Sequence, residues 1–74
     1  MNGLRVMKQA RSLAGASVDD MKSSLPQLKT EHDLAVLRIG YIICRRKRET
    51  EKCNLITARI RKLEKEQPWT RKIN

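Results

Sequence analysis

The sequence is poor in the residues that usually build a compact core. Among its 74 residues it has no phenylalanine and two aromatic residues, Tyr41 and Trp69. Aromatic side chains supply much of the buried area in small cores, and a chain of this length buries only about 60% of its unfolded surface. We therefore expect no deep ligand pocket within a single chain. A fold of this size usually depends on disulfides, a metal ion or a partner chain.

Cysteine and histidine are too scarce for a disulfide framework or a metal site. Cys44 and Cys53 are the two cysteines, and a disulfide framework in so small a chain uses four or more. There is no Cys-x-x-Cys pair, and His32 is the one histidine, so the sequence offers no zinc site. We interpret both cysteines as reduced, small apolar residues, which favours a reducing, cytoplasmic compartment. We expect no cofactor.

Catalytic and membrane-spanning patterns are also missing. The three glycines are scattered and form no phosphate-binding loop. No Ser/His/Asp or Cys/His arrangement can be assembled around the lone His32. The most apolar run, residues 34–44, contains Arg38 and is too short to cross a bilayer. The sequence therefore predicts a protein that is not an enzyme, takes no small-molecule substrate and does not span a membrane.

Positive charge is abundant and unevenly distributed. The chain has 17 Lys and Arg against 8 Asp and Glu, a formal charge of +9 and a sequence pI near 10.3. Residues 45–74 hold eleven of the basic residues and four of the acidic ones. Such a positive field favours polyanionic partners, of which nucleic acid is the most common.

Short helices are expected before the first proline. Apolar residues in the segment 4–14 recur at helical spacing, and Gly15 is a suitable helix end. Ser17, followed three residues later by Asp20, resembles a capping box and predicts a second short turn over residues 18–23. The first part of the chain is therefore predicted to be helical.

The chain divides into three segments at its two prolines. We assign residues 1–24 to a short helical segment, residues 25–67 to one long helix and residues 68–74 to a flexible basic tail. Ser24 is a candidate cap at the first boundary. Residues 1–18 also have the composition of an organelle transit peptide, rich in Arg and Ser and without acidic residues, and this alternative stays open.

The long segment carries a heptad pattern, which predicts an all-α fold built on a coiled coil. Residues 45–51 contain no Gly, Pro, Asn or Asp that would favour a turn, so we predict a continuous helix. Apolar residues recur at steps of four and three over more than five heptads. The central positions of this seam, which we predict to be the dimer interface, are Ala35, Ile39, Ile42, Arg46, Glu49, Cys53, Ile56, Ile60 and Leu63.

Two charged seam residues favour an antiparallel homodimer. In a parallel pair, Arg46 would face Arg46 and Glu49 would face Glu49, which is unfavourable. In an antiparallel pair each Arg46 faces the partner's Glu49, and the two-fold symmetry is closed. Leu34 and Leu37 add apolar surface outside the seam, which the helix over residues 4–14 is available to cover. The predicted product is a small helical bundle.

One flank of the seam is basic. Arg38, Arg45, Lys52 and Arg59 follow one another at seven-residue intervals, so a continuous helix would align them along about 31 Å. Together with Lys47 and Arg48, they are our candidate nucleic-acid contacts. The stripe lacks Asn, Gln and aromatic residues, so we expect it to bind phosphates and not to read bases. This favours shape recognition of a duplex. Double-stranded RNA suits such recognition across its shallow minor groove, and the sequence leaves the choice between RNA and DNA open.

The long helix over Leu28–Leu63, the antiparallel pairing and the Arg38/Arg45/Lys52/Arg59 stripe resemble the small nodavirus suppressors of RNA silencing. That resemblance implies a viral protein that acts as a dimer in the host cytoplasm. It also implies that the protein binds double-stranded RNA along one face and shields it from Dicer and from loading into silencing complexes. Host silencing proteins are then possible further partners.

Two other functions stay open from the sequence. The chain could be a basic helical subunit of a ribosomal or organellar assembly, in which case its seam would match a different chain. It could also lie as a basic helix on an anionic membrane, although its second half has little bulky apolar surface outside the seam.

Overall fold

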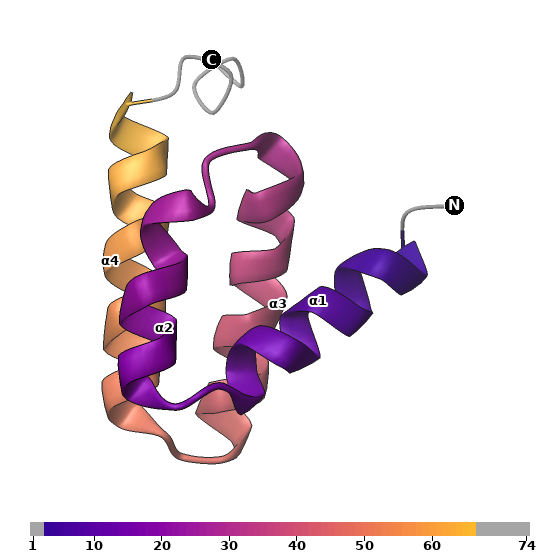
Figure 1. The fold of residues 1–74 in the computed structure, drawn as a ribbon, viewed down its shortest axis with the longest axis vertical. Helices are drawn as coiled ribbons and strands as arrows, with labels where there is room; N and C mark the ends of the chain where they lie inside the picture. Colours follow the sequence, from indigo (N-terminus) through magenta and orange to yellow (C-terminus); the bar gives the residue numbers. More distant parts are fainter. Residues whose placement is uncertain (1–2, 67–74) are drawn as a thin grey trace.

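Helices joined by short connections make up the part of the chain that the structure describes. The computed structural model describes residues 3–66. In chain order it contains α1 (Gly3–Gly15), α2 (Val18–Ser24), the short 3₁₀ helix η1 (Leu25–Gln27), α3 (Glu31–Arg46) and α4 (Thr50–Glu66). Figure 1 shows α2, α3 and α4 running roughly along the long axis, whereas α1 crosses α3 obliquely. The all-α fold class is confirmed for these residues, and the predicted tail, 68–74, lies outside them.

The N-terminal helices begin and end close to the predicted positions. α2 begins after Ser17, whose hydroxyl accepts a hydrogen bond from the Asp20 amide at 3.1 Å. Pro26 lies in the first turn of η1, where its missing N–H is tolerated. Ser24 does not cap η1; its hydroxyl instead donates to the Asp20 carbonyl at 2.8 Å.

The predicted continuous helix over residues 25–67 is wrong, because the segment folds back on itself. α3 begins after Thr30, which forms a reciprocal capping box with Asp33, and ends at Arg46. α4 then begins at Thr50 and runs antiparallel to α3 (Figure 1). Lys47 is still helical in its backbone angles, but Arg48 has a φ of 60°, in the left-handed region.

Backbone hydrogen bonds show how the turn closes. The Arg48 amide donates to the Arg45 carbonyl and the Glu49 amide donates to the Cys44 carbonyl, each at 3.0 Å. This pair of bonds is the Schellman motif, which normally has glycine at the left-handed position. Here arginine occupies that position, so the turn carries no glycine, proline, asparagine or aspartate that would mark it in the sequence.

The antiparallel contacts expected between two chains are formed within one. The Cys53 thiol lies 4.0 Å from the Tyr41 carbonyl, and an added Cβ at Gly40 would lie 3.8 Å from Ile56. The antiparallel register that pairs Arg46 with Glu49 predicts that Ile42 faces Cys53 and Ile39 faces Ile56 across a dimer. The neighbours observed within the chain are one residue away from these pairs. A helical hairpin and an antiparallel helix dimer bring nearly the same residues together, so the heptad phase is satisfied by either.

The apolar core lies where α1 and α4 pack on α3 and where α2 packs on α4. Leu37 and Ile56 are fully buried, as is Cys44. α1 covers α3, as expected for a helix that shields Leu34 and Leu37. Residues 3–66 of a single chain therefore bury an apolar cluster to which every helix of the fold contributes. The buried apolar residues are Ala10, Leu13, Ala14, Met21, Leu25, Leu34, Val36, Leu37, Cys44, Ile56 and Leu63.

Gly40 permits the close crossing of α1 over α3. A Cβ at this position would come within 3.2 Å of the Leu13 side chain and 3.8 Å of the Ala10 carbonyl. The 3.2 Å separation is tighter than ordinary van der Waals contact, whereas 3.8 Å is an ordinary contact. The lone glycine in the middle of α3 is therefore explained by the close approach of α1, chiefly through the Leu13 side chain.

Candidate nucleic-acid interface

The six predicted nucleic-acid contacts do not form one stripe. The hairpin places three of them, Arg45, Lys47 and Arg48, at or next to the α3–α4 turn, where all are exposed. Lys52 and Arg59 turn inward and bond to the backbone of other segments. Arg38 stays on the surface of α3 but is engaged by an acid. The basic surface therefore has a different shape from the one predicted.

The turn cluster consists of Arg45, Arg46, Lys47 and Arg48. All four are exposed, and none forms an ion pair with an acidic residue among residues 3–66. Arg45 and Arg46 are in the last turn of α3, where cations stabilise the negative end of the helix dipole. Part of this charge therefore favours the fold, and all of it is available to an external anion.

Lys52 holds the turn against the end of α1. Its Nζ donates to the Ala14 carbonyl at 3.1 Å and pairs with Glu49 Oε2 at 3.2 Å. The Lys52 side chain is only 13% exposed, so its charge is poorly placed for a large ligand. Glu49 Oε1 is buried and has no hydrogen-bond partner within the described chain, which makes the carboxylate dependent on Lys52.

Arg59 links α4 to the connection between α2 and α3. Its Nε and Nη2 both donate to the Leu28 carbonyl at 3.2 Å, and Nη2 also donates to the Pro26 carbonyl at 3.2 Å. These carbonyls lie at the end of η1, where backbone acceptors lack helical partners. Arg59 is half-buried and is the side chain that satisfies them.

Arg38 forms an exposed ion pair across the hairpin. Its Nη2 lies 3.2 Å from Glu64 Oε2, and the two side chains are 59% and 45% exposed. An exposed pair of this kind contributes about 0.2–1 kcal/mol. A polyanion would have to compete with Glu64 for Arg38.

Two basic surfaces were missed by the sequence argument. α1 has no acidic residue in its first turn, and its exposed side includes Arg5, Lys8 and Arg11. Arg61 and Lys62 are exposed on α4. The absence of acids from residues 3–15 was the available signal, and it was interpreted only as a possible presequence.

Most of the predicted dimer interface lies inside the hairpin. Ile56 and Leu63 are buried in the core of the chain itself. Ala35, Ile39, Cys53, Ile60 and Glu49 are intermediate in exposure. Ile42, which is 50% exposed, and Arg46, which is also exposed, are the seam residues that remain most accessible to a second chain.

Burial alters the chemistry of one cysteine. Cys44 is fully buried where α3 meets α4, and desolvation raises the pKa of its thiol; the nearby Glu49 carboxylate raises the pKa further. The thiolate is the reactive form, so Cys44 is protected both by burial and by its protonation. Both cysteines are free thiols, and this arrangement favours neither catalysis nor exchange at Cys44.

Other classes of site find no support in residues 3–66. In that part of the chain, no three His, Cys, Asp or Glu residues come together in a way that could hold a metal ion. No helix there is long and apolar enough to span a membrane. Comparisons of the chain with protein-family models, with curated proteins and with solved structures found no match.

Proposed function

We propose that the protein binds double-stranded RNA, independently of its base sequence, through the turn cluster of the α3–α4 hairpin. The observation that carries this proposal is the exposure of four consecutive cations, Arg45 to Arg48, with no ion pair to any described acid. The hairpin is fixed by the Schellman bonds and by Lys52, so the cations are displayed on an ordered turn.

Phosphate contacts explain such an interface best. A turn bearing only Arg and Lys offers donors and charge without the amide side chains that commonly read adenine. Four phosphate contacts give a slope of about −3.6 in the logarithm of affinity against the logarithm of salt, by the relation for B-form duplexes. Affinity should then fall about a hundredfold between about 50 and 200 mM salt.

The shielding of duplex RNA from silencing enzymes is the finer part of the proposal. It requires several chains, or an oligomer, to cover a duplex, because one turn cluster spans only a few phosphates. The resemblance to nodavirus suppressors depended on a long helix, which this chain divides into two. The proposed shielding therefore depends on whether the folded hairpin assembles, and Ile42 is the accessible apolar residue of the former seam.

Binding of matched duplexes to matched variants tests the proposal. Fluorescence anisotropy should show salt-dependent binding of unrelated RNA duplexes with similar affinity, and weaker binding of single-stranded RNA. Arg45→Ala/Lys47→Ala should weaken duplex binding about tenfold, since it removes two phosphate contacts. Arg61→Ala/Lys62→Ala removes the same charge from α4 and should have less than a threefold effect.

Equal losses in the two double variants would show that the charge acts generically, and the assignment to the turn would fail. A strong preference for one base sequence would contradict phosphate-led binding. Light scattering in the same samples gives the mass, and Ile42→Glu should lower that mass if the former seam still joins two chains.

A structural role in a larger assembly is the second candidate function. Leu4 is 83% exposed and Ile42 is 50% exposed, so apolar side chains are left on the surface of the folded chain. A subunit whose neighbours are missing would show this feature. Weak binding to duplex RNA, duplex DNA and single strands alike, lost at moderate salt, would favour this function over the first.

A further inference from the structure

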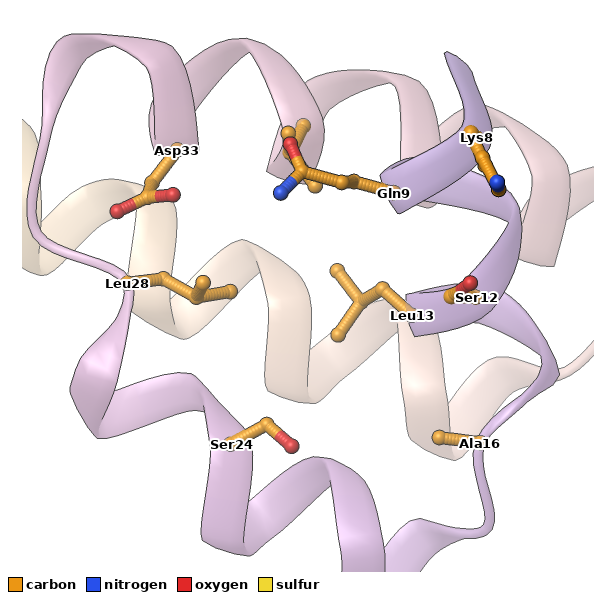
Figure 2. Close-up of a pocket in the computed structure, with 9 residues that line it drawn as sticks. Lys8, Gln9, Ser12, Leu13, Ala16, Ser24, Leu28 and Asp33 are labelled. Carbon is orange, nitrogen blue, oxygen red and sulfur yellow. The ribbon is translucent and has the colours of Figure 1, made fainter. Parts of the chain in front are cut away.

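A cavity of about 390 Å³ lies between α1, the α2–η1 segment and the first turns of α3. Leu13, Leu28 and Val36 form its apolar lining, and Figure 2 shows the Leu13 and Leu28 side chains facing each other across it. The volume falls within the range of about 300–1,000 Å³ that is usual for small-molecule sites. No residue of the turn cluster lines it, so it is a separate surface from the proposed RNA contact.

Polar groups sit at opposite ends of this cavity. Figure 2 shows Asp33 at one end and Lys8 at the other, with Ser12 close to the Lys8 end. Asp33 Oδ2 already accepts hydrogen bonds from the amides of Lys29 at 2.9 Å and Thr30 at 3.1 Å. The Asp33 end of the cavity is therefore largely committed to capping α3.

The α1 end, by contrast, offers donors. Neither the Lys8 ammonium nor the Ser12 hydroxyl forms a hydrogen bond or ion pair with another residue in the range 3–66. The side-chain oxygen of Gln9, Oε1, contacts Nε2 of His32, and this leaves the two hydrogens of the Gln9 side-chain amide for a ligand. An apolar chamber with one free ammonium and neutral donors at its mouth is suited to a molecule with an apolar body and a single anionic head.

We propose that this cavity binds a free, medium-chain monocarboxylate. The alkyl chain would lie between Leu13, Leu28 and Val36, and the carboxylate would pair with Lys8 and accept from Ser12. The formal charge of +9 favours an anionic head over a cationic one at long range. The proposal concerns binding alone and does not depend on the RNA proposal.

Calorimetric titration with sodium decanoate, below the concentration at which it forms micelles, is the direct test. One saturable site is expected. Octanoate should bind about fifteenfold more weakly, because each buried methylene contributes about fourfold to affinity. Decyltrimethylammonium, which has the same chain and the opposite charge, should bind at least tenfold more weakly than decanoate.

Variants on α1 locate the head group. Lys8→Glu should weaken decanoate binding about tenfold. Arg11→Glu is the matched control, since it reverses an exposed charge one turn away that does not line the cavity, and it should have less than a threefold effect. Equal losses in the two variants would overturn the placement of the carboxylate at Lys8.

Two further substitutions test the chamber. Ser12→Trp puts a large side chain at the exposed mouth and should abolish binding while circular dichroism shows unchanged helix content. Leu28→Trp fills the apolar end and should do the same if the first variant does not fold. No saturable binding by the unaltered protein overturns the proposal. The proposal also fails if either folded variant still binds decanoate as the unaltered protein does. It fails as well if decanoate shifts the backbone amide signals in NMR spectra only at the exposed Leu4 and Met7.

Discussion

Substitution of Arg48 is the sharpest test of the helical hairpin. Arg48 has a φ of 60° at the turn between α3 and α4, a conformation that costs an L-residue roughly 1–2 kcal/mol relative to glycine. Glycine loses more backbone entropy on folding, which offsets about 0.5–1 kcal/mol of that gain. Arg48→Gly should therefore stabilise the protein by about 0.5–1 kcal/mol.

The Arg48→Ala variant separates backbone strain from charge. Both substitutions remove one positive charge from the turn cluster, so their difference reports the backbone alone. In the hairpin, alanine keeps the cost of the left-handed conformation, and the glycine variant should be the more stable by about 1 kcal/mol. In a continuous helix the order reverses, because glycine is about 1 kcal/mol less favourable than alanine in a helix interior.

Urea unfolding followed by circular dichroism measures this difference, at several protein concentrations to separate folding from association. Thermal unfolding is an independent check, in which about 1 kcal/mol corresponds to roughly 4–8 °C in a domain of this size. An alanine variant that is more stable than the glycine variant would refute the hairpin and restore the continuous helix.

Three further perturbations follow from the packing. Arg59→Ala should lower the free energy of unfolding by about 1.5–3 kcal/mol, since the carbonyls of Leu28 and Pro26 lose a charged donor; a loss below about 0.5 kcal/mol in urea unfolding would contradict that role. Gly40→Val should destabilise by about 1–3 kcal/mol, because its side chain meets α1, and unaltered unfolding would argue against the close crossing. Cys44 contributes its full stability below the pKa of an unfolded thiol, about 8.5, and progressively less as the pH rises through its raised folded pKa. Iodoacetamide should consequently modify Cys53 well before Cys44, as peptide mass mapping would show, and equal rates would contradict the burial of Cys44.

Local signals were sufficient for the first half of the fold. The helix ending at Gly15 and the start of α2 after Ser17 follow from capping chemistry that acts over three or four residues. The cover that α1 provides for α3 also follows, since apolar surface outside the seam needs a neighbour. These features depend on residues near in sequence or on burial alone, and both can be judged from the chain.

The turn at residues 47–49 could not be predicted in the same way. Its left-handed position is occupied by arginine, so the usual turn residues are absent. The heptad phase did not indicate a turn either, because an antiparallel hairpin with a three-residue turn preserves that phase. Gly40 was the overlooked signal: a single glycine on the assumed outer face of a long helix has no purpose there, whereas a crossing helix explains it.

The site was predictable in composition but not in position. Periodicity places Lys52 and Arg59 on the same flank as Arg45, yet it cannot reveal that Lys52 and Arg59 meet backbone carbonyls from α1 and η1. Those acceptors are brought near only by tertiary packing. The run of exposed cations at residues 45–48 survives because a turn exposes its side chains in almost any fold.

The bonds of Arg59 also have a consequence for the order in which the chain assembles. Its acceptors lie 31 and 33 residues away, whereas the Schellman bonds that close the α3–α4 turn join neighbours in the chain. Loop-closure entropy favours the nearby contacts first, so the hairpin is expected to be present in the folding transition state before Arg59 reaches the end of η1. The hydrogen bonds of Arg59 then form after the transition state. The loss of its side chain should therefore leave the folding rate nearly unchanged and accelerate unfolding.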